Sequence, residues 1–212
     1  SRNPSVEPGH IGIYGVSKGA EAALLVASRS RRLHAAAAGM PASVVFQGGA
    51  DTRPGVEPHS SWTVDGKPVP FVPYDVSQPF DFRDYMGSIF RLYDGGLKDA
   101  AAHADAVIPV ERINGPILLI SGEADAMWPA ARMSNDIVKR LERKRFGFSV
   151  THLSYPDAGH AVGLPPALGA SERGPDEAVG GTAAGNAFAR ADMWPKLVCF
   201  FDGALRGEKG TP

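Results

Sequence analysis

The chain has 212 residues, of which 43% are hydrophobic and 21% are charged, and its formal net charge is −1. This composition is that of an ordinary globular protein, and the length fits one domain better than two. Because 22 basic residues are balanced by 23 acidic ones, no overall field directs the chain toward nucleic acid or an anionic membrane. No apolar run approaches the ~18 residues that a membrane-spanning helix needs.

The sequence contains a single cysteine, Cys199, so it cannot form an intrachain disulfide. Such a chain is typical of a reducing compartment, and we therefore expect a cytoplasmic protein. Cys199 lies in the apolar run 197–201, which predicts a buried side chain that fills the core rather than a nucleophile.

The chain begins with the signals of a strand and a helix. An apolar run at 10–14 predicts the strand, and helical periodicity over 19–32 predicts the helix that follows it. A further strand is expected within 34–40, although the alanines that fill this segment are poor strand formers.

A segment rich in glycine and proline, 48–80, interrupts this rhythm, and we interpret it as an insertion rather than a domain. Within it, Asp65 and Gly66 have the pattern of a tight hairpin turn, so we expect a small two-stranded projection. A second loop rich in glycine, proline and alanine, 161–185, is too short for a core of its own. Loops of this length are often binding loops or mobile lids.

The second half of the chain alternates strands with helices. Strands are predicted at 117–120 and 150–155, and helices at 130–145 and 186–206. The continuous apolar run after Pro116 is typical of a strand covered on both faces, as in a parallel sheet. We therefore expect an α/β fold with a mostly parallel sheet flanked by helices.

Ser17 is the candidate nucleophile. It lies between the first predicted strand and helix, with Gly15 and Gly19 two residues before and after it. This is the pattern of a nucleophile elbow, in which small neighbours let strand and helix approach closely. The backbone N–H of Lys18 would then lie at a helix N-terminus, where it can stabilise an oxyanion formed when Ser17 attacks a carbonyl.

A serine nucleophile needs a base, and the base needs a group that fixes its tautomer. Asp125 follows the strand 117–120, and His160 follows the strand 150–155. The order nucleophile, acid, base is that of α/β-hydrolases, and the carboxyl ends of strands are where open α/β sheets place functional groups. We assign Asp125 as acid and His160 as base. The alternative acids are Asp51 as second choice, Glu123, and, less favoured because of its closeness to the base, Asp157.

The remaining candidates are weaker. Other histidines lie inside a strand, in the insertion or in alanine-rich segments, namely His152, His59, His34 and His103. Zinc-binding and phosphate-loop motifs are absent from the sequence, so we expect no metal and no cofactor. Trp128 is a candidate wall of an acyl site.

Two basic runs, 29–32 and 140–145, lie at the ends of predicted helices. Cations there complement the helix C-terminus, which is the favoured interpretation. The alternative is that either run contacts the phosphates of a coenzyme A substrate.

Three motifs carry a resemblance to a known family. They are the elbow 12–21, the segment 116–125 with Trp128 and Pro129, and the segment 153–160. In this order they resemble the C-terminal catalytic domain of acyl-CoA thioesterases and bile acid-CoA:amino acid N-acyltransferases, and the similarity spans most of the chain. The resemblance implies an α/β-hydrolase domain over 1–212 that acts on an acyl thioester of coenzyme A or a carrier protein.

Carried over residue by residue, the family's nucleophile, acid and base fall on Ser17, Asp125 and His160. The conjugating acyltransferases of the family carry cysteine as nucleophile, so serine here favours hydrolysis. Transfer of the acyl group to an amine or alcohol is the second hypothesis. A non-catalytic subunit with a hydrolase fold is the third.

The family's chain begins upstream, with a β-sandwich domain and the first strands of the hydrolase sheet. Such hydrolases take a second oxyanion donor from a loop after one of those strands, and loss of one donor costs ~10²- to 10³-fold in rate. We therefore expect an N-terminal segment or a second chain to complete both the sheet and the oxyanion hole.

Overall fold

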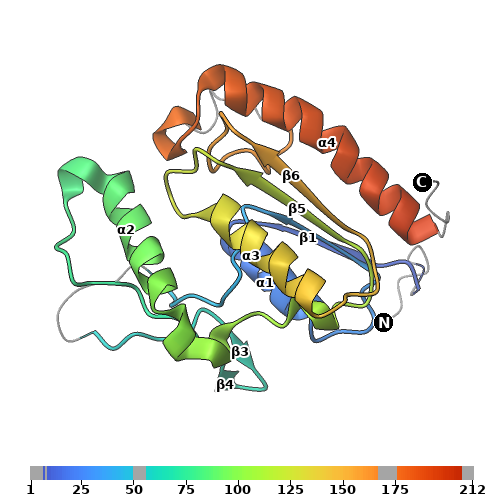
Figure 1. Cartoon of the computed structure of the whole chain (residues 1–212), viewed down its shortest axis with the longest axis horizontal. Coiled ribbons are helices and arrows are strands. Elements are labelled where there is room, and N and C mark those ends of the chain that lie inside the picture. The colour runs from blue at the N-terminus through green and yellow to red at the C-terminus, as the bar shows by residue number, and fades with distance from the viewer. Residues whose placement is uncertain (1–6, 8, 50–55, 167–175, 207–212) are drawn as a thin grey trace.

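A four-stranded parallel sheet forms the centre of the chain (Figure 1). The computed structural model describes residues 7, 9–49, 56–166 and 176–206. The strands lie in the order β1-β2-β5-β6, and their bounds are Gly12–Val16, Ala35–Gly39, Ile117–Gly122 and Val150–Tyr155. All neighbours pair in parallel, which confirms the predicted α/β fold with a parallel sheet.

Helices cover both faces of this sheet. α1 (Lys18–Ala27) and α3 (Ala130–Arg143) pack on one face, and α4 (Ala183–Arg206) crosses the other (Figure 1). α2 (Tyr85–Lys98) stands beside the edge at which the strands end. Short 3-10 helices complete the described elements, namely η1 (Phe82–Asp84), η2 (Ala100–Ala106), η3 (Val110–Arg112) and η5 (Asp176–Val179).

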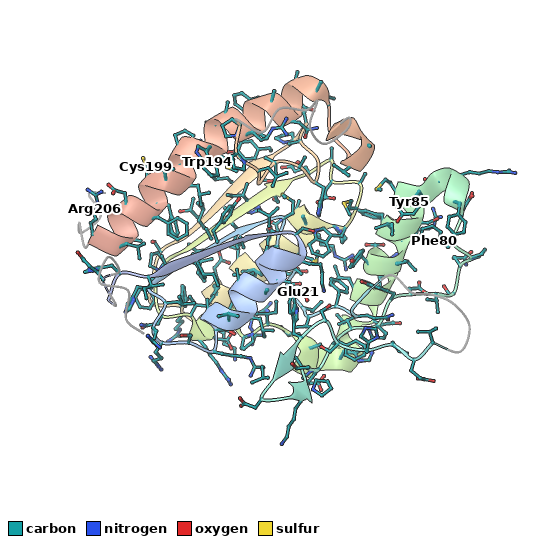
Figure 2. The ribbon with its side chains drawn as sticks, turned by 180° about the vertical axis from the view of Figure 1, so that it is seen from behind. Glu21, Phe80, Tyr85, Trp194, Cys199 and Arg206 are labelled. Atoms are coloured by element: carbon teal, nitrogen blue, oxygen red, sulfur yellow. The ribbon has the colours of Figure 1, made fainter. Side chains whose placement is uncertain are left out.

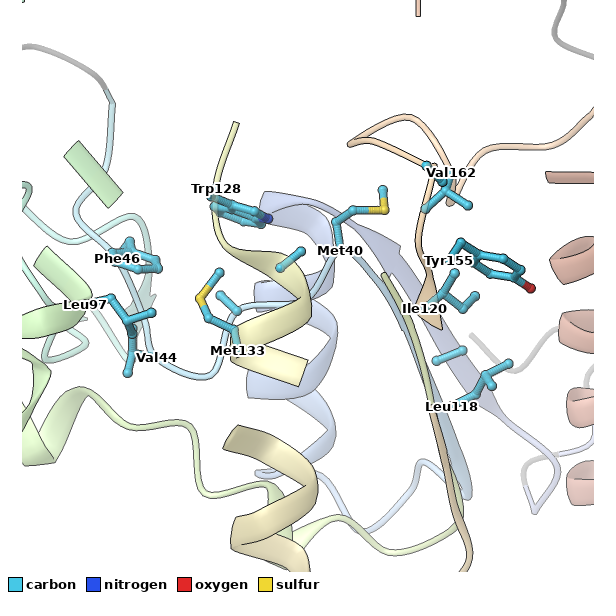
Figure 3. Close-up of a cluster of buried hydrophobic side chains, with 14 of the residues drawn as sticks. Met40, Val44, Phe46, Leu97, Leu118, Ile120, Trp128, Met133, Tyr155 and Val162 are labelled. Atoms are coloured by element: carbon cyan, nitrogen blue, oxygen red, sulfur yellow. The ribbon is translucent and has the colours of Figure 1, made fainter. Parts of the chain in front are cut away.

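Apolar side chains fill both faces because successive residues of a strand point to opposite sides. In β5, Ile117 and Leu119 belong to the buried cluster that contains α1 and α3. Leu118 and Ile120 belong to the cluster that contains α4. Figure 3 shows that the second cluster continues past the strand ends to Trp128, so the core reaches the edge where the candidate site residues lie.

β2 consists of four alanines and a glycine, all buried. Its neighbours β1 and β5 supply the hydrogen bonds, and helices press on it from both faces, so small side chains suit the position despite their low strand propensity. A Cβ on Gly39 would lie 3.2 Å from Gly163 Cα and from the Tyr14 hydroxyl, which leaves little room for a larger residue. The strand expected within 34–40 is therefore confirmed.

The predicted insertion contains the expected hairpin. β3 (Thr63–Val64) and β4 (Lys67–Pro68) pair antiparallel. Asp65 and Gly66 have φ of 51° and 75°, the left-handed values that a two-residue turn of type I′ requires at both positions. The small two-stranded projection is confirmed.

α2 has no counterpart among the predicted helices. It contains three glycines, which lower helix propensity and hide the pattern. One of them is required by packing, since a Cβ on Gly96 would lie 2.4 Å from the Pro73 carbonyl oxygen. The helix starts at a side-chain cap, in which the Asp84 carboxylate accepts the Gly87 N–H at 3.2 Å.

α4 begins at Ala183, three residues before the predicted start at residue 186. Cys199 is exposed on this helix (Figure 2), so the prediction that it fills the core was wrong. α4 presents Leu197 to the sheet, and a side chain two positions further along a helix points away from that face.

Within the described residues, no helix has the length and apolar character needed to cross a membrane.

Candidate active site

β1 passes into α1 through a sharp turn at Ser17, which has φ 58° and ψ −127° and caps the helix N-terminus. A residue other than glycine rarely takes a positive φ, and such strain is typical of nucleophile elbows. A Cβ on Gly15 would lie 2.0 Å from the Gly19 carbonyl oxygen, so only glycine fits at position 15. A Cβ on Gly19 would have no neighbour within 4 Å, so space does not require glycine there.

The fold brings the predicted nucleophile, base and acid within hydrogen-bond distance of one another. Ser17 Oγ lies 2.7 Å from His160 Nε2, and His160 Nδ1 lies 2.7 Å from Asp125 Oδ2. Because an ionised carboxylate can only accept, we assign the ring proton to Nδ1. Nε2 is then free to accept the proton of the Ser17 hydroxyl.

The loop after β5 fixes the Asp125 carboxylate. Its Oδ1 accepts the backbone N–H groups of Met127 at 2.8 Å and Trp128 at 3.2 Å, which leaves Oδ2 for His160. Asp125 and His160 are only 7% and 8% exposed, so the pair is shielded from competing water. Both residues follow strands whose carboxyl ends meet at one edge of the sheet, which explains why they converge.

Lys18, the predicted oxyanion donor, is the first residue of α1. The first N–H groups of a helix have no acceptor within the helix, so the Lys18 N–H is available beside Ser17. Its use in binding an oxyanion stays a prediction. The N-terminal segment or second chain expected to supply another donor also stays a prediction.

Asn186, which the sequence analysis did not single out, ties the loops of the acid and the base together. Its side chain accepts the Gly159 N–H at 2.8 Å and donates to the Gly180 carbonyl oxygen at 3.1 Å. Gly180 in turn forms a β-bridge with Asp125. Asn186 is fully buried in the first turns of α4, so one amide holds the residues next to both His160 and Asp125.

We expect Asn186→Ala to destabilise the protein by about 1–3 kcal/mol, because it leaves the buried Gly159 N–H without a partner. The His160 loop should also shift, so that labelling of Ser17 by a fluorophosphonate slows by ~10- to 100-fold. Urea unfolding and labelling kinetics measure the two effects. Asn135→Ala, at an exposed position of α3, is the matched control and should change neither. Equal labelling rates in both variants would contradict this role.

Glu21, in the first turn of α1 (Figure 2), lies at the centre of a buried polar cluster. Its carboxylate accepts hydrogen bonds from Lys18 Nζ at 2.7 Å, Trp62 Nε1 at 2.7 Å and the Phe46 N–H at 3.2 Å. Burial raises the pKa of Glu21, and the Lys18 ammonium opposes that shift. The cluster joins the insertion, through Trp62, and the segment before it, through Phe46, to the first turn of α1.

We expect Glu21→Gln to lower the free energy of unfolding by about 1–2 kcal/mol. The amide keeps the shape, but it removes the charge that balances Lys18, whose partial exposure limits the cost. Urea unfolding is the measurement, with Glu142→Gln on the exposed face of α3 as the matched control. A variant as stable as the wild type would show that this carboxylate is not needed as an ion.

Trp128, the predicted wall of an acyl site, packs against the His160 imidazole. The two rings meet edge to face with centroids 5.5 Å apart, and the indole is 1% exposed. Its other neighbours are Tyr93, edge to face at 5.1 Å, and Phe46, stacked at 6.2 Å. Trp128 therefore supports the imidazole within the core, while contact with an acyl chain stays a prediction.

Among the described residues, Asp125 is the carboxylate that bonds to the predicted base. Glu123 accepts a hydrogen bond from a serine hydroxyl of β6 at 2.8 Å, and Asp157 is exposed. Asp51 lies outside the described residues. His152 instead contacts Ser121, with 2.7 Å between Nε2 and Oγ. In the part of the chain that the structure describes, no group of three or more His, Cys, Asp or Glu is placed to hold a metal ion.

Comparison with known proteins identifies the family. The chain matches the model of the family described as "BAAT / Acyl-CoA thioester hydrolase C terminal" over residues 1–207. It belongs to this family. Acyl-coenzyme A thioesterase 1 of Homo sapiens is 27% identical over 217 residues, which cover 99% of this chain and 47% of that protein. Acyl-coenzyme A thioesterase 3 of Mus musculus is 27% identical over 215 residues, with coverages of 99% and 46%.

The chain thus spans less than half the length of these relatives. Among solved structures, the orthorhombic crystal form of Pyrococcus horikoshii acylaminoacyl peptidase gives a TM-score of 0.54 at 16% identity. The match covers 99% of this chain and 26% of the peptidase chain. At this identity the likeness shows the fold alone, and it confirms the predicted α/β-hydrolase fold.

Proposed function

We propose that this chain hydrolyses acyl-CoA thioesters through an acyl-serine intermediate at Ser17. The observation that carries the proposal is the pair of 2.7 Å contacts that join Ser17 to His160 and His160 to Asp125, in a member of the acyl-CoA thioester hydrolase family. The strained elbow at Ser17 supports the same chemistry, because it places the hydroxyl at the edge where the strands end.

In the first half-reaction, Ser17 Oγ attacks the thioester carbonyl carbon while its proton passes to His160 Nε2. The Asp125 carboxylate stabilises the imidazolium through Nδ1–H. The negative charge on the former carbonyl oxygen is held by the Lys18 N–H at the start of α1. When the tetrahedral intermediate collapses, the carbon–sulfur bond breaks, and the thiolate of coenzyme A takes the proton from His160.

The second half-reaction releases the acid. A water molecule attacks the acyl-serine carbonyl carbon and gives a proton to His160 Nε2. Collapse of this second intermediate returns the proton to Ser17 Oγ and frees the fatty acid. Each cycle therefore leaves His160 neutral and Asp125 ionised, as at the start.

Acyl transfer is the second candidate, because the family description names BAAT beside the thioester hydrolases and the sequence motifs also resemble bile acid-CoA:amino acid N-acyltransferases. An amine or alcohol would then replace water in the second half-reaction, with the same acyl-serine before it. The serine at the nucleophile position, where the conjugating enzymes carry cysteine, favours water as the acceptor.

The test is a panel of acyl-CoA thioesters of increasing chain length, assayed for free thiol and for products by mass spectrometry. We expect free fatty acid as product, at rates that are unchanged by added glycine or taurine. An amide product that dominates in the presence of either amine would assign transfer instead. Absence of turnover with every thioester would favour the non-catalytic alternative.

A further inference from the structure

The two basic runs, far apart in the sequence, meet at one end of the sheet. The segment 28–31 after α1, the segment 144–148 after α3 and the segment 111–114 before β5 line a hollow of about 600 Å³. Both helices run antiparallel to the strands, so their C-termini lie where the strands begin (Figure 1). Ser17 lies at the other end of α1, about 15 Å away along its ten residues. The hollow is therefore separate from the candidate active site.

The hollow carries a concentrated positive charge. Five cationic side chains line it, namely those of Arg29, Arg31, Arg112, Lys144 and Arg145. Among the described residues that line it, Glu111 alone is acidic, and Arg140 donates two hydrogen bonds of 2.6 and 2.8 Å to this carboxylate. Within the described part of the chain, none of the four lining arginines lies within salt-bridge distance of a carboxylate.

The C-termini of α1 and α3 neutralise only part of the positive charge at the hollow. The C-terminal ends of α1 and α3 contribute about half a negative charge each. Together they balance about one of the five cations, so about four positive charges remain at one hollow of a chain whose net charge is −1.

Arg145 occupies a backbone position that favours glycine. It follows Lys144, the C-cap of α3, and has φ 51°. Its N–H donates to the Glu142 carbonyl oxygen at 3.0 Å, and the Phe146 N–H donates to the Leu141 carbonyl oxygen at 3.0 Å. This is a Schellman motif, whose left-handed residue is usually glycine. Here the motif instead carries an arginine side chain that lines the hollow.

Two aromatic rings lie beside the cations. Phe146 and Phe148 both line the hollow, their centroids are 5.5 Å apart, and Phe148 is 46% exposed. Exposed rings provide a flat apolar surface next to the charged groups, and flat surfaces of this kind accept the base of a nucleotide.

We propose that this hollow binds a nucleotide, with its phosphates on the arginines and its base against Phe148. Arginine is the side chain best suited to phosphate, because its planar group donates two parallel hydrogen bonds. The volume of about 600 Å³ falls in the range of small-molecule sites, which favours a nucleotide over a macromolecule. The inference goes beyond the proposed thioesterase function and does not depend on it.

The test is calorimetric titration of the full chain with ADP. We expect one site, whose affinity falls as salt screens the arginines. Arg31→Ala and Arg145→Gly should each weaken binding at least about tenfold. Arg145→Gly should also raise the Tm or leave it unchanged, because glycine relieves the left-handed backbone, so its loss of binding cannot come from misfolding. Arg83→Ala, an exposed arginine of η1, is the matched control and should bind ADP as the wild type does.

Further titrations separate the contribution of the base from that of the phosphates. Adenosine and pyrophosphate should each bind at least about tenfold more weakly than ADP, since each keeps only part of the contact. Blocking Ser17 with a fluorophosphonate should leave ADP binding unchanged. The proposal is overturned by no binding at about 5 mM ADP. It is also overturned by equal loss in Arg83→Ala, by loss on Ser17 blocking, or by tighter binding of a single-stranded oligonucleotide through the same arginines.

Discussion

Ser17→Ala should lower the rate of acyl-CoA hydrolysis by about 10⁵-fold or more, because removal of a serine nucleophile leaves only binding and oxyanion stabilisation. KM should change little, since the hydroxyl contributes to bond making rather than to holding the substrate. The free energy of unfolding should change little, because Ser17 makes no side-chain cap to α1 and alanine keeps the same Cβ at the strained backbone position. Release of free thiol in steady state is the measurement.

Ser121→Ala is the matched control for this variant. Ser121 Oγ also lies 2.7 Å from a histidine nitrogen, that of His152. Ser17 differs from Ser121 in its strained backbone and in the Asp125 carboxylate that bonds to its partner imidazole. Only loss of Ser17 should therefore abolish turnover. If Ser121→Ala lost as much activity as Ser17→Ala, the assignment of the nucleophile would be wrong.

Asp125→Asn should lower kcat by about 10⁴-fold, as the same exchange does in other serine hydrolases. The amide keeps the shape of the carboxylate, but one of its two positions is now an NH₂ group, which cannot accept a hydrogen bond. That group would face either His160 Nδ1 or the backbone N–H groups of Met127 and Trp128. The imidazole then favours the tautomer with hydrogen on Nε2, which cannot accept the Ser17 proton. The geometry makes the effect large, because Asp125 Oδ2 lies 2.7 Å from Nδ1 and both residues are buried.

The pH dependence of kcat adds a second readout for Asp125→Asn. At higher pH, activity should recover in part where hydroxide replaces the lost general base. Asp157→Asn is the control, since Asp157 lies three residues before His160, is exposed, and was an alternative acid in the sequence. A large loss in Asp157→Asn with little loss in Asp125→Asn would reverse the two assignments.

The sheet could be predicted from the sequence because its strong signals are local. The run 117–120 is apolar throughout, and the strand 150–155 has the observed bounds. β2 was harder, since only burial between two helix layers makes alanine suitable there. α2 was not predicted, because its three glycines lower helix propensity, and the close approach to Pro73 that requires Gly96 is not visible in local sequence.

The three central residues of the site follow from position along the chain. Ser17, Asp125 and His160 each lie within five residues of the end of a predicted strand, and parallel strands bring their carboxyl ends to one edge. Glu21 and Asn186 could not be predicted in the same way, because the partners of their buried polar groups lie on distant loops. Their one local signal is a polar residue on the inward face of a helix, which becomes informative only when the packing is known.

The most direct measurement is reaction with a fluorophosphonate followed by peptide mass spectrometry, because it reports an activated hydroxyl without reference to any substrate. We expect stoichiometric labelling on Ser17, at a rate that falls at least about 10³-fold in His160→Ala, since the 2.7 Å contact between Ser17 Oγ and His160 Nε2 carries the proton transfer. Labelling of a different residue would contradict this expectation. Labelling of Ser17 at the same rate without His160 would contradict it as well.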